Sequence, residues 1–145
     1  MQSITPITVR YGETDMMGVV YHANYVLYFE DARIKFLEDM GYPYARVEEE
    51  GLMSPVVSVE LHYGKPLKYG QKPVVLTEVA DIRPMKVTFS YQVFDSLESL
   101  EAGSKPCCTG TSVHCLVDAA SFKPVSMKKA APELYRKYVE ACQEG

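Results

Sequence analysis

No stretch of this 145-residue sequence is apolar for the roughly 20 residues that a membrane-spanning helix needs. Basic residues are also few, since 15 lysines and arginines stand against 19 aspartates and glutamates, a net charge of −4. The broad basic surface typical of nucleic-acid binding is therefore excluded. Residues 1–10 lack the apolar core of a secretion signal. We expect one domain over residues 1–145, in the cytoplasm, with no membrane span and no nucleic-acid partner.

Cysteine occurs four times, but no two cysteines form a C-x-x-C pair and none has the spacing of a structural zinc site. We expect reduced thiols, no metal site and no cofactor. The sequence also lacks the G-x-S-x-G motif of serine hydrolases and the glycine-rich loop ending in Gly-Lys-Ser/Thr that binds phosphates. Serine nucleophiles and nucleotide hydrolysis are therefore disfavoured.

The longest segment with helical periodicity runs from His22 to Met40. Gly41 followed by Pro43 supplies a stop signal at its end. Apolar residues such as Leu27 and Ile34 fall outside the main apolar side of this helix. This predicts a helix covered on more than one face, against a sheet that curves around it.

The remaining pattern is that of an antiparallel sheet with two more helices. Strands are predicted over Ile4–Tyr11, Val56–Tyr63, Val74–Ile82, Val87–Phe94 and Thr109–Val117. A short helix over Tyr44–Glu50 and a C-terminal helix over Pro132–Cys142 are also predicted. Because the connections are short, the sheet should be mostly antiparallel, and the fold class is α+β.

An acidic residue, Asp15, stands in an apolar turn broken by Gly18, directly before the long helix. Beside Met16, Met17, Val19 and Val20 its carboxylate is expected to lose some hydration, which raises its basicity. A helix that starts near His22 offers backbone N–H groups without intrahelical acceptors. The pattern predicts a base and the donors for an oxyanion in one place, with no side chain at Gly18 to block the approach.

The run from Asp15 to Tyr25, D-M-M-G-V-V-Y-H-A-N-Y, followed by Glu30-Asp31-Ala32-Arg33, resembles the signature of one family of acyl-CoA thioesterases. This family is the 4-hydroxybenzoyl-CoA thioesterase-like (YbgC-type) branch of the hotdog fold. Tyr63, Pro66 and Gly70 also match the family, and the resemblance extends from about Ile7 to Val117. It implies a five-stranded antiparallel sheet wrapped around a central helix, and a homodimer or homotetramer with active sites at the dimer interface.

The resemblance also implies roles for individual residues. The family's catalytic aspartate corresponds to Asp15, and the amide that polarises the thioester carbonyl corresponds to that of His22. The substrate is then a thioester of coenzyme A or of an acyl carrier protein. Asp15 would act as a general base on water or attack the carbonyl to form a mixed anhydride, and both routes stay open.

Several neighbours are candidates for substrate binding. Tyr21 and Tyr25 belong to a tyrosine stripe that packs in the core or lines the acyl slot. Asn24 serves as a helix cap, the favoured interpretation, or as a polar contact to substrate. Arg83 and Lys86, at a strand turn, are candidates for coenzyme A phosphates.

Two other functions compete. A hotdog hydratase or dehydratase would need a histidine base and an acid across the dimer, for which His22 and Glu30 are available. An alternative role for Glu30 is a simple ion pair with Arg33, three residues on along the helix. The other competitor is an acyl-CoA-binding dimer without catalysis.

Overall fold

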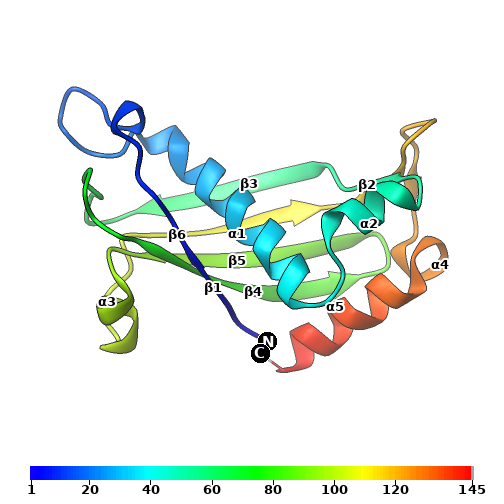
Figure 1. The fold of residues 1–145 in the computed structure, drawn as a ribbon. Helices are drawn as coiled ribbons and strands as arrows, with labels where there is room; N and C mark the ends of the chain where they lie inside the picture. The colour runs from blue at the N-terminus through cyan, green and yellow to red at the C-terminus, as the bar shows by residue number, and fades with distance from the viewer. Residues whose placement is uncertain (145) are drawn as a thin grey trace.

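The computed structural model describes residues 1–144 and consists of a curved sheet with a long helix across one face (Figure 1). All neighbouring strands of the five-stranded sheet are antiparallel, in the order β1-β4-β5-β6-β3. The strands are β1 (Ser3–Pro6), β3 (Val56–Tyr63), β4 (Val74–Arg83), β5 (Lys86–Phe94) and β6 (Cys108–His114). The predicted α+β class and the sheet around a central helix are confirmed.

The central helix α1 (Tyr25–Asp39) follows a 3₁₀ turn, η2 (His22–Asn24). Its Phe29, Ala32 and Phe36 are buried against the sheet, and the Phe29 ring stacks on Tyr91 of β5 at 4.2 Å. Gly110 of β6 makes this possible, because a Cβ there would lie 2.6 Å from the Phe29 ring. Shape complementarity between helix and sheet therefore depends on one residue without a side chain.

The curvature of the sheet has a local origin in two register shifts. One lies between Val56 and Ser58 on β3, and the other between Val79 and Asp81 on β4. An extra residue on one strand bends it and increases its twist, which contributes to the curvature of the sheet.

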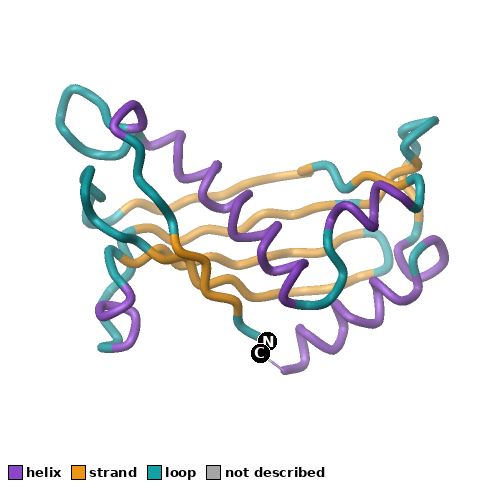
Figure 2. The backbone as a smooth tube through the Cα atoms, viewed as in Figure 1, coloured by secondary structure: helices purple, strands orange, loops and turns teal. Residues whose placement is uncertain are grey.

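A second, three-stranded sheet closes one end of the molecule, as Figure 2 shows. It consists of β2 (Leu52–Met53), β7 (Leu116–Asp118) and β8 (Pro124–Val125). The helices outside α1 are α2 (Tyr44–Glu49), α3 (Leu97–Glu101), α4 (Met127–Ala130) and α5 (Pro132–Glu144). Helix α5 packs on β4, and the ring centre of its Tyr138 lies 5.8 Å from that of Phe89 on β5.

Two predicted strands are wrong in their extent. The first ends at Pro6, and Tyr11 instead begins a 3₁₀ turn, η1 (Tyr11–Glu13). Ile7 still donates to the Pro73 carbonyl at 2.9 Å, but Pro73 has no N–H to return a bond, so the ladder stops there. The segment Thr109–Val117 divides at Cys115, whose amide donates to Pro55, so that β6 and β7 belong to different sheets.

Strand β3 is an edge strand, hydrogen-bonded only to β6 among the described residues. Val56, Val57 and Val59 on it are 38 to 50% exposed, as are Val26 and Leu27 of α1. The expectation that α1 is covered on several faces therefore holds only in part within one chain. Within residues 1–144 no helix is both long and apolar enough to cross a membrane.

Candidate active site

Asp15 lies in a narrow turn fixed by backbone hydrogen bonds. Its amide donates to the Val19 carbonyl at 2.9 Å, and its carbonyl accepts from the Gly18 amide at 3.0 Å. Its Oδ1 accepts from the Met17 amide at 2.8 Å, while no described residue donates to its Oδ2. The turn therefore holds one carboxylate oxygen and leaves the other available to a ligand.

The two methionines beside Asp15 are exposed and do not cover it within the chain. Met16 and Met17 are 106% and 79% exposed, and only Val20, at the base of the turn, is buried. Asp15 is itself half-buried and Val19 is half-buried beside it, so the expected partial loss of hydration stays a prediction, to which the two exposed methionines contribute little within one chain. Any shielding by Met16 or Met17 requires another molecule to cover them.

The Glu13 carbonyl links this turn to the start of α1. It accepts from the Tyr21 amide and from Nδ2 of Asn24, both at 2.9 Å. Asn24 is at the N-cap position of α1 but makes no side-chain capping bond, so the favoured interpretation as a cap is wrong. Oε1 of Glu13 accepts from the Tyr28 hydroxyl at 2.9 Å. Burial and this bond raise the pKa of Tyr28, which stays a neutral donor.

His22 begins the 3₁₀ turn η2, while the α-helix itself starts at Tyr25, three residues later than predicted. The first amides of such a turn have no acceptor within it. Thr14 bridges Val20, so the loop that contains Asp15 closes directly before η2, at the N-terminal end of α1 (Figure 1). The His22 side chain is exposed, and its carbonyl accepts from the Tyr63 hydroxyl at 2.9 Å.

Aromatic rings surround this end of the helix. The Tyr63 ring lies 5.4 Å from that of Tyr25 and 6.2 Å from that of His22, and the Tyr21 ring lies 4.4 Å from His22. Tyr25 is 3% exposed, and burial raises its pKa to about 12. Tyr21 is 45% exposed. Of the two tyrosines predicted to bind substrate, only Tyr21 offers an accessible ring in this chain.

The loop between β3 and β4, residues 64–73, is hydrogen-bonded to the chain directly after the Asp15 turn. Val20 donates to the Leu67 carbonyl at 2.8 Å, and Val19 forms a bridge with Lys68. Leu67 is fully buried. The position of Asp15 therefore depends on a loop some fifty residues further along the chain.

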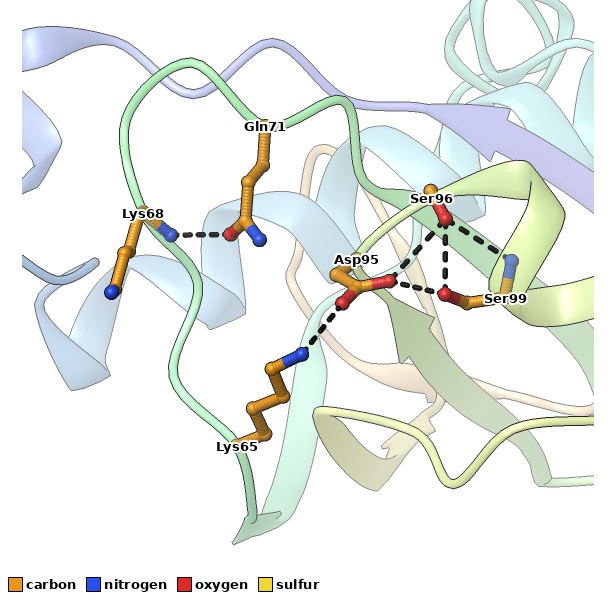
Figure 3. Close-up of polar contacts among 6 residues, drawn as sticks. All are labelled: Lys65, Lys68, Gln71, Asp95, Ser96 and Ser99. Atoms are coloured by element: carbon orange, nitrogen blue, oxygen red, sulfur yellow. Dashed lines mark hydrogen bonds and ion pairs between the residues drawn. The ribbon is translucent and has the colours of Figure 1, made fainter.

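Polar contacts anchor that loop (Figure 3). Nζ of Lys65 pairs with Oδ2 of Asp95 at 3.2 Å, and the other Asp95 oxygen accepts from the Ser99 hydroxyl at 2.5 Å. These two bonds, Ser99 foremost, lower the pKa of Asp95. The Lys68 amide donates to Oε1 of Gln71 at 2.7 Å. The loop is thus tied both to itself and to the start of α3.

Arg83 and Lys86 lie away from this site. They are opposite each other on neighbouring strands at the β4–β5 turn, and both are exposed. Nε of Arg83 forms an ion pair with Oδ2 of Asp81 at 3.0 Å. Strand β4 begins at Val74, next to Pro6 of β1, and runs ten residues to Arg83. At about 3.3 Å per residue, this puts Arg83 at the opposite end of the sheet from Asp15 in the same chain.

A groove of about 110 Å³ runs between α1 and the β3 edge. Its lining combines apolar and charged residues: Val26, Phe29, Glu30, Arg33, Val56, Val59 and Ser112. A larger hollow of about 600 Å³ lies between residues 6–9, the loop 69–74 and α3, but neither Asp15 nor His22 lines it. Neither Asp15 nor His22 lines the α1–β3 groove either, so neither of these two hollows of the single chain contains the candidate catalytic residues.

Sequence reasoning missed two supports of the site, Glu13 and Leu67. Glu13 follows Arg10 by three residues, the spacing of a capping box, and its Oε1 does accept from the Arg10 amide at 2.9 Å. That spacing could have identified it. Leu67 had no such signal, because its role depends on a carbonyl group that every residue has.

Residues 9–136 match a family model described as the thioesterase-like superfamily. The chain is 39% identical to a Bacillus subtilis protein named "Putative acyl-CoA thioesterase YneP", over 93% of this chain and 94% of that protein. It is 30% identical to the acyl-CoA thioesterase YbgC of Haemophilus influenzae, over 86% of this chain and 87% of that protein.

A solved structure has a similar fold. The DHNA-CoA thioesterase from Staphylococcus aureus superposes with a TM-score of 0.88 at 32% sequence identity, covering 96% of this chain and 89% of that chain. At this similarity the arrangement of helix and sheet is shared over nearly the whole of both chains.

Proposed function

Because the chain belongs to the thioesterase-like superfamily, we propose that it is an acyl-CoA thioesterase with Asp15 as its catalytic carboxylate. The reaction adds water to the thioester carbonyl and releases a carboxylate and the thiol of coenzyme A. The observation that carries the proposal is the Asp15 turn, which fixes one carboxylate oxygen and leaves the other free at the end of α1 where the His22 amide lies.

A thioester suits a site with a single carboxylate. The leaving thiol has an acidity comparable to that of a free cysteine, with a pKa near ~8.5, so it departs with little help from an acid. Asp15 either takes a proton from the attacking water or attacks the carbonyl itself, and water then hydrolyses the mixed anhydride. In both routes the carbonyl oxygen becomes negative and needs a donor.

The His22 amide would be that donor. It is the first amide of the turn that leads into α1, where the positive end of the helix dipole adds to its field. Such a donor contributes roughly 2.7 to 4 kcal/mol to the transition state in comparable sites. Gly18 and Tyr21, both exposed beside Asp15 and His22, would form the approach for the acyl group.

We propose further that the active unit is a dimer in which the β3 edges of two chains pair. An exposed edge strand rich in valine is a template for another strand, and β3 carries Val56, Val57 and Val59 at such an edge. A second chain would continue the sheet and cover the groove beside α1. Contact with a second chain would also explain why the side chains of Met16 and Met17 are exposed in one chain.

The dimer gives Arg83 and Lys86 a role despite their position. A two-fold axis at β3 reverses the partner's strands, so the partner subunit's β4–β5 turn would lie at the end of the joined sheet that holds Asp15. The partner's β5 would be three strands away from this chain's β3, or roughly 14 Å. A coenzyme A extended across the partner's sheet would then bring its phosphates to these two side chains.

A panel of acyl-CoA, aroyl-CoA and acyl carrier protein thioesters tests the reaction. We expect a free thiol in the amount of substrate consumed, with no change in enoyl absorbance. A change in enoyl absorbance without thiol would instead support a hydratase that uses His22 and Glu30. Tight binding of every thioester without turnover would support a binding protein. The panel also separates coenzyme A from carrier protein as donor, and the cytoplasmic location stays a prediction.

A further inference from the structure

Glu30 and Arg33 lie one helical turn apart on α1 and line the same groove beside β3. The sequence predicts that they pair with each other, yet in the described residues neither takes part in an ion pair. Glu30 is exposed and Arg33 is half-buried. The groove therefore holds two opposite charges that the chain itself does not neutralise.

Arg33 extends its guanidinium toward a buried polar network. Its Nη1 lies 3.5 Å from Nε2 of His114, which contacts the Ser112 hydroxyl at 2.7 Å, and Ser112 contacts the Tyr91 hydroxyl at 2.6 Å. Burial, and then the charge of Arg33, lower the pKa of His114 to about 3, so this histidine is neutral. The network orients the cation without supplying an anion, and a partly dehydrated cation without an anion is costly.

Along α1 the two residues bracket the middle of β3. Phe29, just before Glu30, lies over Gly110, which is paired with Leu61 of β3. Arg33 contacts His114, which is paired with Val56. The midpoint between Glu30 and Arg33 is therefore level with the centre of β3, near Val59. A two-fold axis at that point would place a second α1 antiparallel to the first across the groove.

We propose that Glu30 of each subunit pairs with Arg33 of the other, so that two reciprocal ion pairs close the dimer over the α1–β3 groove. This inference rests on the proposed β3 dimer and adds the residues that set its register. An isologous interface satisfies both charges at once, because contact of 30 with 33 implies contact of 33 with 30. A small anion would neutralise Arg33 alone and would be repelled by Glu30, so a second copy of the chain fits the groove better.

Charge reversal with complementation tests the pairing. Glu30→Arg puts two arginines opposite each other at both contacts, and Arg33→Glu puts two glutamates there. We expect each variant alone to weaken its dimer by about tenfold or more. A mixture of the two should form a 1:1 heterodimer, because both contacts then join opposite charges. Native mass spectrometry of chains with different mass tags measures the species, and Glu38→Arg, exposed on the same helix, is the matched control.

Several outcomes would overturn the inference: a monomeric wild type, a Glu30→Arg variant that dimerises as tightly as wild type, or two weakened variants that do not pair when mixed. If Arg33→Glu fails to fold, Glu30→Gln decides, since it leaves the Arg33 network intact. We expect added salt to weaken the wild-type dimer and to have much less effect on Glu30→Gln. Equal dimer affinity of the two at all salt concentrations overturns the pairing. Because these measurements read mass and not turnover, failure of the thioesterase proposal would be seen separately.

Discussion

At the scale of single residues, Gly18 controls how Asp15 is presented. Its φ of +78° lies in the left-handed region, and its amide closes the turn by donating to the Asp15 carbonyl. A Cβ at Gly18 would meet no atom within 4 Å, so any effect of a side chain there comes from the backbone alone. This makes Gly18 a clean test of whether the turn matters.

We predict that Gly18→Ala destabilises the folded chain by roughly 1 to 2 kcal/mol, the strain of a left-handed alanine, and lowers kcat as Asp15 shifts. Urea unfolding and the thiol-release assay measure the two effects. Gly12→Ala is the control, because a Cβ at Gly12 also meets open space and its φ is not positive. Equal behaviour of the two variants would show that the turn conformation is unimportant.

His114 predicts a dependence of stability on pH. Its pKa is lowered from 6.5 to about 3 in the folded chain, so below pH 6.5 the unfolded chain binds a proton that the folded chain does not. Stability is therefore fully present above pH 6.5 and decreases as pH falls toward 3, by up to about 1.4 kcal/mol per pH unit. Urea unfolding between pH 7.5 and 5 measures this slope, above the range in which carboxylates titrate.

The variant His114→Gln should flatten that slope, although it also removes contacts to Ser112 and Arg33. A steep slope that survives His114→Gln would assign the proton to another group.

The turn that holds Asp15 and Gly18 could be predicted because a turn leaves a local signature. The shielding of Asp15 and the cap by Asn24 could not. Whether Met16 covers the carboxylate depends on what packs against the turn, and whether Asn24 caps the helix depends on the competing Glu13 carbonyl, which the turn brings within reach. Both are outcomes of tertiary packing and are absent from the local sequence.

At the scale of elements, Gly110 sets the distance between α1 and the sheet. A Cβ there would lie 2.5 Å from the Glu60 carbonyl oxygen and 2.6 Å from the Phe29 ring. We predict that Gly110→Ala destabilises the fold by about 1 to 3 kcal/mol through overpacking, measured by urea unfolding. Adding Phe29→Leu should not restore stability, because the clash with the backbone of Glu60 remains. Full recovery in the double variant would show that only the ring was in the way.

Among the strands, the long central ones were predictable and the two-residue ones were not, while the short helix α2 matches its prediction to within one residue. Strand β3 and the start of β4 match the predicted bounds, because eight or more residues with β-forming side chains leave few alternatives. Strands β2 and β8 have two residues each and exist because β7 separates from β6 at Cys115. No turn residue marks that break, so the sequence pattern runs on through it.

At the scale of the whole molecule, one chain leaves uncovered several groups that the proposed dimer would cover. The methionines beside Asp15, the valines of β3 and the two charges of the α1–β3 groove are all open in the single chain. The sequence resemblance implied a site shared by two subunits, and the geometry of one chain supports that view.

This predicts that turnover depends on the dimer. Turnover per chain should fall on dilution through the dimer dissociation constant, and Glu30→Arg should shift that fall to higher concentration. Thiol release in a dilution series, with mass photometry of the same samples, measures both quantities. Turnover per chain that stays constant while the dimer dissociates would place a complete site in one subunit.

The proposed reaction depends on the Asp15 carboxylate, and the variant Asp15→Asn removes its charge while keeping the shape of the side chain. Asparagine keeps an oxygen to accept from the Met17 amide but can neither take a proton from water nor attack a thioester. Asp118→Asn is the matched control, since Asp118 also accepts backbone amides in a turn, those of Ala120 and Ser121. The measurement is steady-state thiol release from the best thioester of the panel, with binding of a non-hydrolysable analogue. We predict that Asp15→Asn binds the analogue as wild type does and loses about 10²- to 10⁴-fold or more in kcat, while Asp118→Asn keeps its kcat. Wild-type turnover by Asp15→Asn would contradict the account.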